Sequence, residues 1–97
     1  MLEELWTLVR KVPPGRVASY GAVGRALRNP ASGFQVGRWM AQCPEGVPWW
    51  RIVAQTGQLP VGKRDPFLAS EQALRLQKEG ATITDGIVAP DCFWDEW

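Results

Sequence analysis

The sequence contains no histidine and only two cysteines, Cys43 and Cys92. Histidine is the commonest general base in enzymes and the commonest metal ligand, so its absence excludes histidine-based nucleophilic catalysis and most zinc sites. Two cysteines are also too few for a disulfide framework or for a cluster of thiolates around a metal. We therefore expect neither a metal ion nor a cofactor.

Long apolar runs are missing as well. No apolar run approaches the length of a membrane span, and no charged start leads into an apolar signal segment. Of the 97 residues 45% are hydrophobic, which is enough for one small core. We expect a single domain over residues 1–97 that is monomeric, lies in the cytoplasm and has no membrane partner.

Acidic residues are scarce in one part of the chain and basic residues in the rest. Between Arg10 and Arg64, seven arginines and two lysines stand against one acid, Glu45, whereas the remainder holds nine acids against Arg75 and Lys78. This division of charge indicates a face that binds a polyanion, backed by an acidic face. The alternative is ordinary solvated charge that folding mixes evenly.

The spacing of the apolar residues predicts four helices. They are expected over residues 2–11, 20–28 and 33–42 and between Asp65 and Gly80. In the last helix, Asp65 is the expected N-cap and Gly80 ends the helix. Its buried stripe is expected to consist of Phe67 and Leu74, with Ala69, Ala73 and Leu76 beside them.

The second and third helices are close enough in sequence for a helix-turn-helix, with Ser19 and Ser32 as their N-caps. Gly33, Gly37 and Ala41 recur every four residues along the third helix. A glycine inside a helix costs about 1 kcal/mol relative to alanine, so this pattern indicates that something approaches the helix backbone closely. DNA and a neighbouring helix are both candidates.

Residues 50–54 and 58–59 are predicted to form a two-stranded wing that turns at Thr56 and Gly57. The aromatic and acidic tail, residues 89–97, is expected to pack back on the domain. A helix-turn-helix followed by a wing indicates a mainly α fold with a small β wing, the winged helix-turn-helix class.

Several motifs together carry a family resemblance. The runs VPPGRVASYGAVGRAL, FQVGRWM and PWWRIVAQTGQL are followed by Glu79 and Gly80. In this order they resemble the DNA-binding C-terminal domain of the O6-alkylguanine-DNA alkyltransferases, over roughly residues 3–80. In that family a Pro-Cys-His-Arg segment carries the cysteine that accepts the alkyl group of a flipped guanine and the histidine that activates it.

Both catalytic residues of that segment are replaced here. The chain has Trp49 and Trp50 between Pro48 and Arg51, and only Glu79, aligned with the family's orienting carboxylate, remains of the relay. A tryptophan carbon does not replace a thiolate, because alkyl transfer needs a low-pKa sulfur with a proton acceptor nearby. Trp in place of the cysteine is the mark of the alkyltransferase-like proteins, although these usually keep the histidine.

Alkyltransferase-like proteins bind alkylated guanine without repairing it and pass the site to nucleotide excision repair. The resemblance therefore implies a protein that is no enzyme and whose partners are double-stranded DNA containing O6-alkylguanine and nucleotide excision repair proteins. In a bacterium it would be associated with the nucleoid. Two alternatives stay open: a winged-helix transcription factor that recognises a DNA sequence, and a residual alkyltransferase that uses Cys43 or Cys92.

The resemblance also assigns residues to two sites. The residues implied in DNA binding are Ser19, Tyr20, Ser32, Gly33, Phe34, Gln35, Gly37, Arg38 and Ala41. The residues implied in the pocket for the alkylated base are Tyr20, Trp49, Trp50, Arg51, Ile52, Gly62, Lys63 and Arg64.

Some of these residues have implied roles. Tyr20 matches the tyrosine that helps to rotate the nucleotide out of the duplex, and the carbonyl of Ile52 matches one that contacts the base. Phe34 stands where the family inserts an arginine into the duplex, so either its ring stacks in the gap, or Arg38 reaches in, or flipping is impaired. Arg64 is a candidate for the lesion-probing arginine that similar proteins carry at the place of Gly62.

Overall fold

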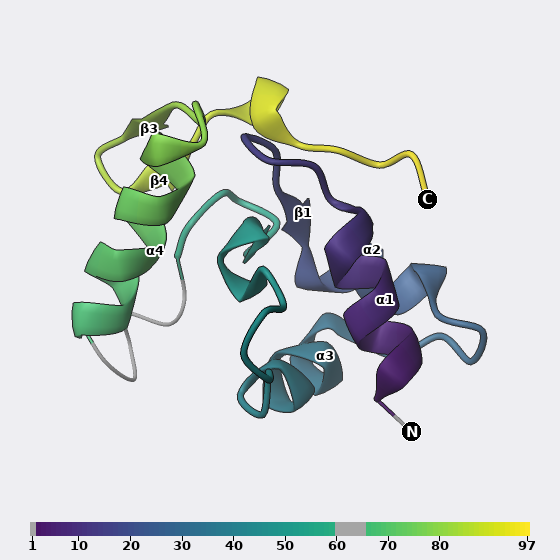
Figure 1. Ribbon diagram of the computed structural model, residues 1–97. Coiled ribbons are helices and arrows are strands. Elements are labelled where there is room, and N and C mark those ends of the chain that lie inside the picture. The colour runs from purple at the N-terminus through teal and green to yellow at the C-terminus, as the bar shows by residue number, and fades with distance from the viewer. Residues whose placement is uncertain (1, 60–65) are drawn as a thin grey trace.

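The computed structural model describes residues 2–59 and 66–97, and within them it is mainly helical (Figure 1). The α-helices are α1 (Glu3–Lys11), α2 (Tyr20–Ala26), α3 (Gly33–Met40) and α4 (Pro66–Lys78). The strands are β1 (Ala18–Ser19), β2 (Ile52–Val53), β3 (Ile83–Thr84) and β4 (Ile87–Val88). Short 3₁₀ helices cover Trp49–Arg51 and Pro90–Cys92. None of the helices in this part of the chain is long and apolar enough to cross a membrane.

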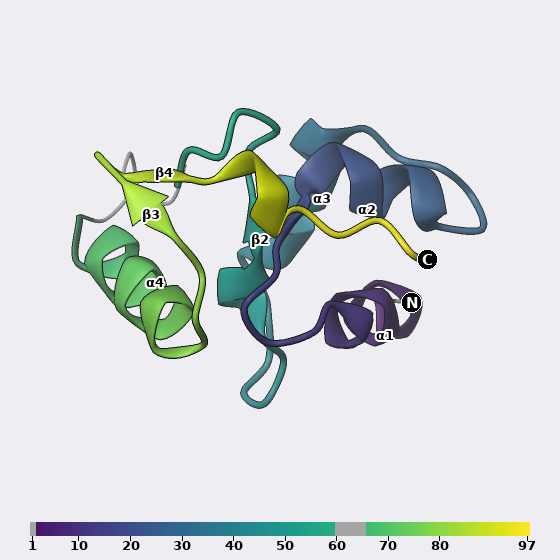
Figure 2. The ribbon, with the colours of Figure 1, turned by 90° about the horizontal axis from the view of Figure 1, so that it is seen from above.

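Strand β2 lies in the middle of the molecule. Helices α1, α2 and α3 are on one side of it, and α4 with the β3–β4 hairpin is on the other (Figures 1 and 2). Ile52 belongs to the core cluster of the three helices, whereas Val53 belongs to the cluster under α4. Because successive side chains of a strand point to opposite faces, this one short strand joins the two halves of the core.

The predicted helix-turn-helix and both of its N-caps are confirmed. The hydroxyl oxygen of Ser19 accepts from the backbone N–H of Ala22 at 3.0 Å, and that of Ser32 accepts from Gln35 at 3.1 Å. Helices α2 and α3 each end two residues earlier than predicted, at Ala26 and Met40. The two helices pack closely against each other.

The predicted pairing of residues 50–54 with 58–59 is wrong. Strand β2 instead pairs in parallel with β1, with Ile52 opposite Ala18. Both residues of β2 are fully buried, which suits a strand covered on both faces rather than the edge of a wing. The turn is still present, because the N–H of Ala54 donates to the carbonyl of Gln58 at 3.0 Å.

The small antiparallel hairpin of this fold is β3–β4. Its turn residues, Asp85 and Gly86, have φ angles of 53° and 75°. A tight hairpin turn of this kind needs positive φ at both positions, which Asp-Gly supplies. Gln58 bridges to Ile87 of β4, so the turn after β2 packs onto the hairpin.

The predicted buried stripe of α4 is confirmed at Leu76 but wrong at Phe67 and Leu74. Phe67 is 84% exposed and Leu74 is 52% exposed, whereas Gln72 and Leu76 are fully buried. The Nε2 group of Gln72 donates to the backbone carbonyls of Trp50 and Ile52, each at 3.0 Å. Because these bonds satisfy the buried amide nitrogen, a polar side chain occupies the place expected for an apolar one.

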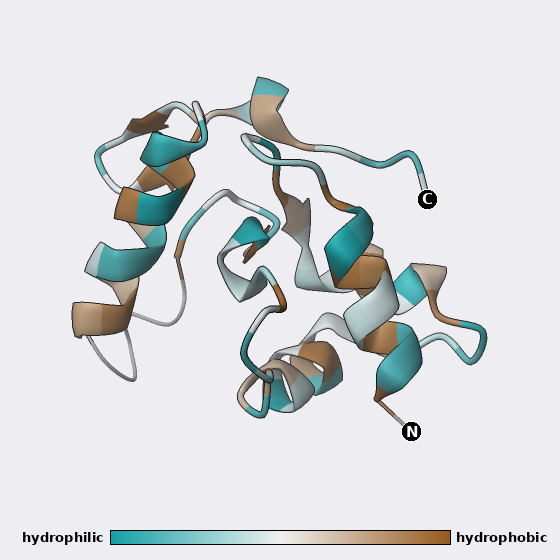
Figure 3. Cartoon of the chain, viewed as in Figure 1, coloured by the Kyte–Doolittle hydropathy of each residue, from teal (hydrophilic) through white to brown (hydrophobic). Residues whose placement is uncertain are grey.

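The tail packs back on the rest of the chain, as predicted. The N–H of Val17 donates to the carbonyl of Cys92 at 2.9 Å, and the N–H of Trp94 donates to the carbonyl of Val17 at 2.8 Å. The guanidinium of Arg16 adds bonds to the carbonyls of Cys92 and Phe93. After the last short helix the tail becomes hydrophilic towards the C-terminus (Figure 3).

Candidate functional site

A cavity of about 170 Å³ lies where α2, α3, α4 and the Trp49–Arg51 turn meet. The described residues that line it are Tyr20, Gly37, Met40, Ala41, Cys43, Trp49 and Leu68. Four of them were assigned from the sequence to DNA binding or to the base pocket, namely Tyr20, Gly37, Ala41 and Trp49. The fold therefore brings residues that are far apart in the sequence to one hollow.

Tyr20 and Trp49 reach the cavity from the ends of two paired strands. Tyr20 directly follows β1, and Trp49 begins the turn that leads into β2. A Cβ atom at Gly37 would lie 3.9 Å from Cδ1 of Tyr20, so the ring of Tyr20 lies against the bare backbone of α3. The glycine leaves one side of the cavity open.

The row of small residues on α3 serves two purposes. A Cβ atom at Gly33 would lie 3.1 Å from the backbone nitrogen of Gly21, so this glycine allows α2 to pack closely. Gly37 and Ala41 line the cavity instead. The helix-packing explanation therefore applies to Gly33, whereas close approach of a ligand to the other two positions stays a prediction.

Cys43 lines the cavity but lacks the features of an alkyl acceptor. Burial raises the pKa of its thiol to about 11, with the charge of Arg10 opposing that shift. Its Sγ atom lies 3.9 Å from the carbonyl of Val47, to which it donates. Since the thiolate is the nucleophile, a thiol with a raised pKa is poorly reactive at neutral pH.

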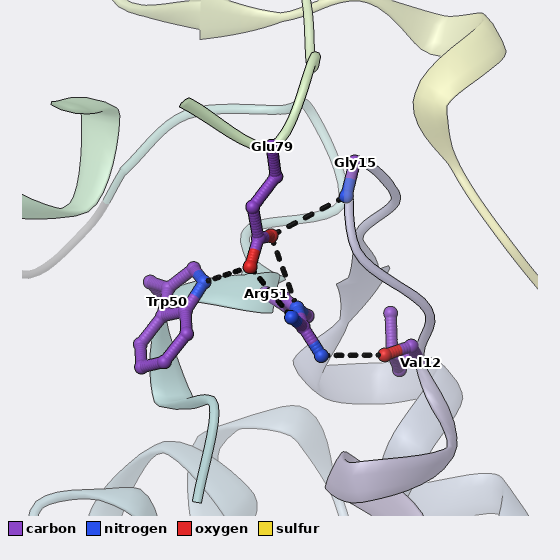
Figure 4. A network of polar contacts seen from close by, with 5 residues as sticks. All are labelled: Val12, Gly15, Trp50, Arg51 and Glu79. Atoms are coloured by element: carbon purple, nitrogen blue, oxygen red, sulfur yellow. Dashed lines mark hydrogen bonds and ion pairs between the residues drawn. The ribbon is translucent and has the colours of Figure 1, made fainter. Parts of the chain in front are cut away.

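A polar network lies behind the Trp49–Arg51 turn, centred on Glu79 (Figure 4). Its carboxylate accepts from Nε1 of Trp50 at 3.1 Å, from Nε of Arg51 at 3.0 Å and from the backbone N–H of Gly15 at 3.3 Å. Nη2 of Arg51 also donates to Glu79, and Nη1 donates to the carbonyl of Val12 at 3.0 Å. The network ties together the end of α1, the turn and the end of α4.

These contacts determine the ionisation of Glu79. Burial by itself would raise the pKa of this carboxyl group. The hydrogen bonds from Arg51, Trp50 and Gly15, together with the positive charge of Arg51, outweigh burial and lower the pKa below its usual value of 4.5. Glu79 is therefore ionised near neutral pH.

Trp50, Arg51 and Ile52 are not among the residues that line the cavity. Trp50 faces Glu79, and the guanidinium group of Arg75 lies 4.6 Å from the centre of its ring. Ile52 is buried, and its carbonyl accepts from Gln72. These residues support the cavity wall from behind, and a direct contact with a base stays a prediction.

Helix α3 and its N-cap carry four of the other residues assigned to DNA binding, whereas the fifth, Ser19, is the buried N-cap of α2. Phe34 is 76% exposed, and Ser32 and Arg38 are exposed as well. Gln35 is half-buried beside the Ser32 cap. An apolar ring on a protruding helix start suits insertion between base steps.

One cavity residue, Leu68, was missed by sequence reasoning, and three predicted pocket residues are not described. Leu68 lines the cavity, and its spacing of four and eight residues from Gln72 and Leu76 marks the buried face of α4. Gly62, Lys63 and Arg64 lie outside the described residues. Within the described part of the chain, no group of three acidic, cysteine or histidine residues is arranged to hold a metal ion.

Comparisons with known proteins point in one direction. The family described as 6-O-methylguanine DNA methyltransferase, DNA binding domain, matches residues 1–81. Alkyltransferase-like protein 1 of Schizosaccharomyces pombe is 36% identical over 84 residues, which are 82% of this chain and 75% of that protein. A DNA base-flipping protein of Vibrio parahaemolyticus is 26% identical over 87% of this chain and 83% of its own length.

A larger protein and a solved complex are also similar. The bifunctional methyltransferase/endonuclease of Thermoplasma volcanium is 32% identical over 92% of this chain, but the chain spans only 28% of that protein's length. The crystal structure of S. pombe Atl1 in complex with damaged DNA containing O6-carboxymethylguanine superimposes with a TM-score of 0.79 at 29% identity. That match covers 94% of this chain and 91% of the other.

Proposed function

The chain belongs to the family of the 6-O-methylguanine DNA methyltransferase DNA-binding domain, and on that premise we propose that it is a lesion-binding protein. It binds O6-alkylguanine in duplex DNA, holds the extruded base and leaves the alkyl group in place. The observation that carries the proposal is Trp49, which lines the cavity together with Tyr20 and the small face of α3, at the position of the family's acceptor cysteine.

Binding follows from the shape and chemistry of the cavity. Tyr20 pushes the nucleotide out of the duplex, and the ring of Phe34 fills the gap in the base stack. The extruded base lies against Trp49, which offers a broad apolar face to the alkyl group. Each buried Å² of apolar surface contributes about 25 cal/mol, so an alkylated base is retained better than guanine.

Extrusion also favours the damaged base. Flipping costs a few kcal/mol, and it costs less where pairing is already weakened by the lesion. Discrimination therefore combines easier extrusion with better retention and needs no chemical step. Recognition without a chemical step agrees with the absence of a thiolate at residue 49.

The bound complex then serves as a signal. We propose that the protein acts as a monomer on DNA and marks the site for nucleotide excision repair proteins. The uneven charge of the chain supports attachment to DNA through its basic part. The acidic residues of the remainder, including those of the tail, are left for other contacts.

Two readouts on one sample test the proposed function. A duplex carries O6-methylguanine next to 2-aminopurine, whose fluorescence rises when its neighbour leaves the stack. We expect the fluorescence to rise on binding, and we expect the mass of the recovered protein to be unchanged. A gain of one methyl group on the protein would contradict the proposal, and a peptide map would show whether Cys43 or Cys92 carries it.

A further inference from the structure

We propose that Trp50 is a positioning residue for lesion binding, which acts by fixing the indole ring of Trp49 as a rigid wall of the cavity. The inference rests on the proposed function, and it concerns a residue at which this chain departs from the histidine of its relatives. Trp50 itself does not line the cavity, so its effect passes through its neighbour.

The two indole rings are in direct contact. Their centres are 6.1 Å apart, and their planes meet at 86°, so the edge of one ring meets the face of the other. This is a favourable arrangement for two aromatic rings, because the positive edge of one lies on the negative face of the other. The orientation of Trp50 therefore limits the orientations open to Trp49.

Trp50 is held on several sides. Its ring nitrogen donates to Glu79 at 3.1 Å, and the guanidinium of Arg75 lies 4.6 Å from the ring centre. The guanidinium of Arg51 approaches the ring to 5.5 Å. The backbone carbonyl of Trp50 accepts from Gln72 at 3.0 Å.

Glu79 is itself fixed in place. Both oxygens of its carboxylate are used, by Arg51 and Gly15 on one and by Arg51 and Trp50 on the other (Figure 4). Arg51 is anchored in turn to the carbonyl of Val12. The carboxylate that orients a catalytic histidine in the transferases thus orients an indole ring here.

A fixed wall matters because an unfixed one must be ordered on binding. A side chain that becomes immobilised in a complex loses conformational freedom, and this loss weakens the complex. If Trp50 were released, Trp49 would sample several orientations and would stack less well on an extruded base. The affinity for undamaged DNA would not change, because undamaged DNA contacts the surface of α3 and does not enter the cavity.

The test is Trp50→Phe, which keeps an aromatic ring next to Trp49 but removes the N–H that bonds to Glu79. The affinity ratio between an O6-methylguanine duplex and its unmodified twin is measured together with the dissociation rates. The matched control is Trp94→Phe, the same change at a half-buried tryptophan of the tail. Unfolding by urea is followed for every variant.

We expect Trp50→Phe to lower the affinity ratio about threefold to tenfold through faster dissociation from the lesion, in line with the freeing of one side chain. The control should leave the ratio unchanged. If Trp50→Phe lowered stability but left the ratio intact, Trp50 would have only a structural role and the inference would be overturned. If the unaltered protein showed no preference for the lesion, the proposed function itself would fail.

A second variant at the same position tests the hydrogen bond to Glu79 separately from any loss of folding. Trp50→His supplies a smaller ring that still carries an N–H within the same segment. We expect it to recover part of the affinity ratio lost in Trp50→Phe, because the bond to Glu79 can form again. A ratio no better than that of Trp50→Phe, in a folded protein, would contradict a role for that bond.

Discussion

In the proposed function, Trp49 determines what happens to a base that enters the cavity. The residue places a large apolar ring where the transferases place a reactive sulfur, and Cys43, the thiol that does line the cavity, has a raised pKa. In the proposed function, the site therefore holds a base rather than reacting with it. At the scale of single residues, two predictions follow from the groups that form this wall and support it.

We predict that Trp49→Ala lowers the affinity for the lesion duplex roughly tenfold, because stacking of a base on an aromatic ring is worth about 1–3 kcal/mol. Affinity for the unmodified duplex should change little. Trp49→Phe, which keeps an aromatic face, should retain most of the preference. Titrations of both duplexes by fluorescence anisotropy check this, and equal losses on the two duplexes would speak against a base pocket at this position.

Glu79 gives a prediction about pH. Its pKa in the folded protein is lowered, so its contribution to stability is present above its usual value of 4.5 and is lost as the pH falls through the lower folded value. Glu79→Gln should reduce the free energy of unfolding by about 1–3 kcal/mol near neutral pH, since charged hydrogen bonds are lost.

The difference between the two proteins should then shrink as the pH falls below 4.5. Urea unfolding of both proteins at neutral and at acidic pH measures this difference. A gap that stayed constant with pH would mean that the charge of Glu79 is not what stabilises the fold.

At the scale of elements, the contact between α2 and α3 depends on backbone that carries no side chain. A Cβ atom at Gly24 would lie 2.0 Å from the carbonyl oxygen of Ala31, in the connection between the two helices. The N–H of Ala31 also donates to the carbonyl of Gly24 at 3.1 Å. This close approach holds the connection that leads into α3 against α2.

We predict that Gly24→Ala destabilises the protein by about 1–3 kcal/mol or more, because the added methyl group overlaps with backbone. Gly21→Ala, in the same helix, is the control. There the new Cβ atom meets only the flexible side chain of Arg25 at 3.4 Å, and the higher helix propensity should add up to about 1 kcal/mol. The melting temperatures of both variants, measured by thermal unfolding, test this prediction. Similar melting temperatures would refute the packing argument.

Phe34, exposed near the start of α3, is the element's contact with the base stack in the proposed function. We predict that Phe34→Ala lowers lesion affinity about tenfold, by loss of the stacking that fills the gap. Leu74→Ala, at another exposed apolar residue, should have no such effect. The same anisotropy titration measures both, and an unaffected Phe34→Ala would favour Arg38 as the inserted residue.

An element can be predicted from the sequence when the residues that determine it are close together in the chain. The caps at Ser19 and Ser32 are decided within a few residues, and both predictions are confirmed. The partner of β2 is β1, more than thirty residues earlier, and no local pattern reveals it. No prediction covered the β3–β4 hairpin, although Asp85 followed by Gly86 is a local signal for its tight turn.

At the scale of the whole molecule, the cavity forms where the two halves of the core meet. Its wall combines the helix-turn-helix, the turn before β2 and α4, which are separate in the sequence. The family resemblance predicted Tyr20, Trp49 and the small residues of α3 as site residues. It did not supply Leu68, because Gln72 hides the buried face of α4 in the sequence, and the acceptors of its amide nitrogen are brought near only by folding.

The central claim is that the protein recognises a damaged base without changing it. The most direct test is an anisotropy titration with two short duplexes that differ only by one O6-methylguanine, at a stated salt concentration. The account predicts binding to the lesion duplex about tenfold tighter or more, a difference of roughly 1.4 kcal/mol, with the methyl group still on the DNA afterwards. Equal affinity for the two duplexes, or a methyl group lost from the DNA, would contradict it.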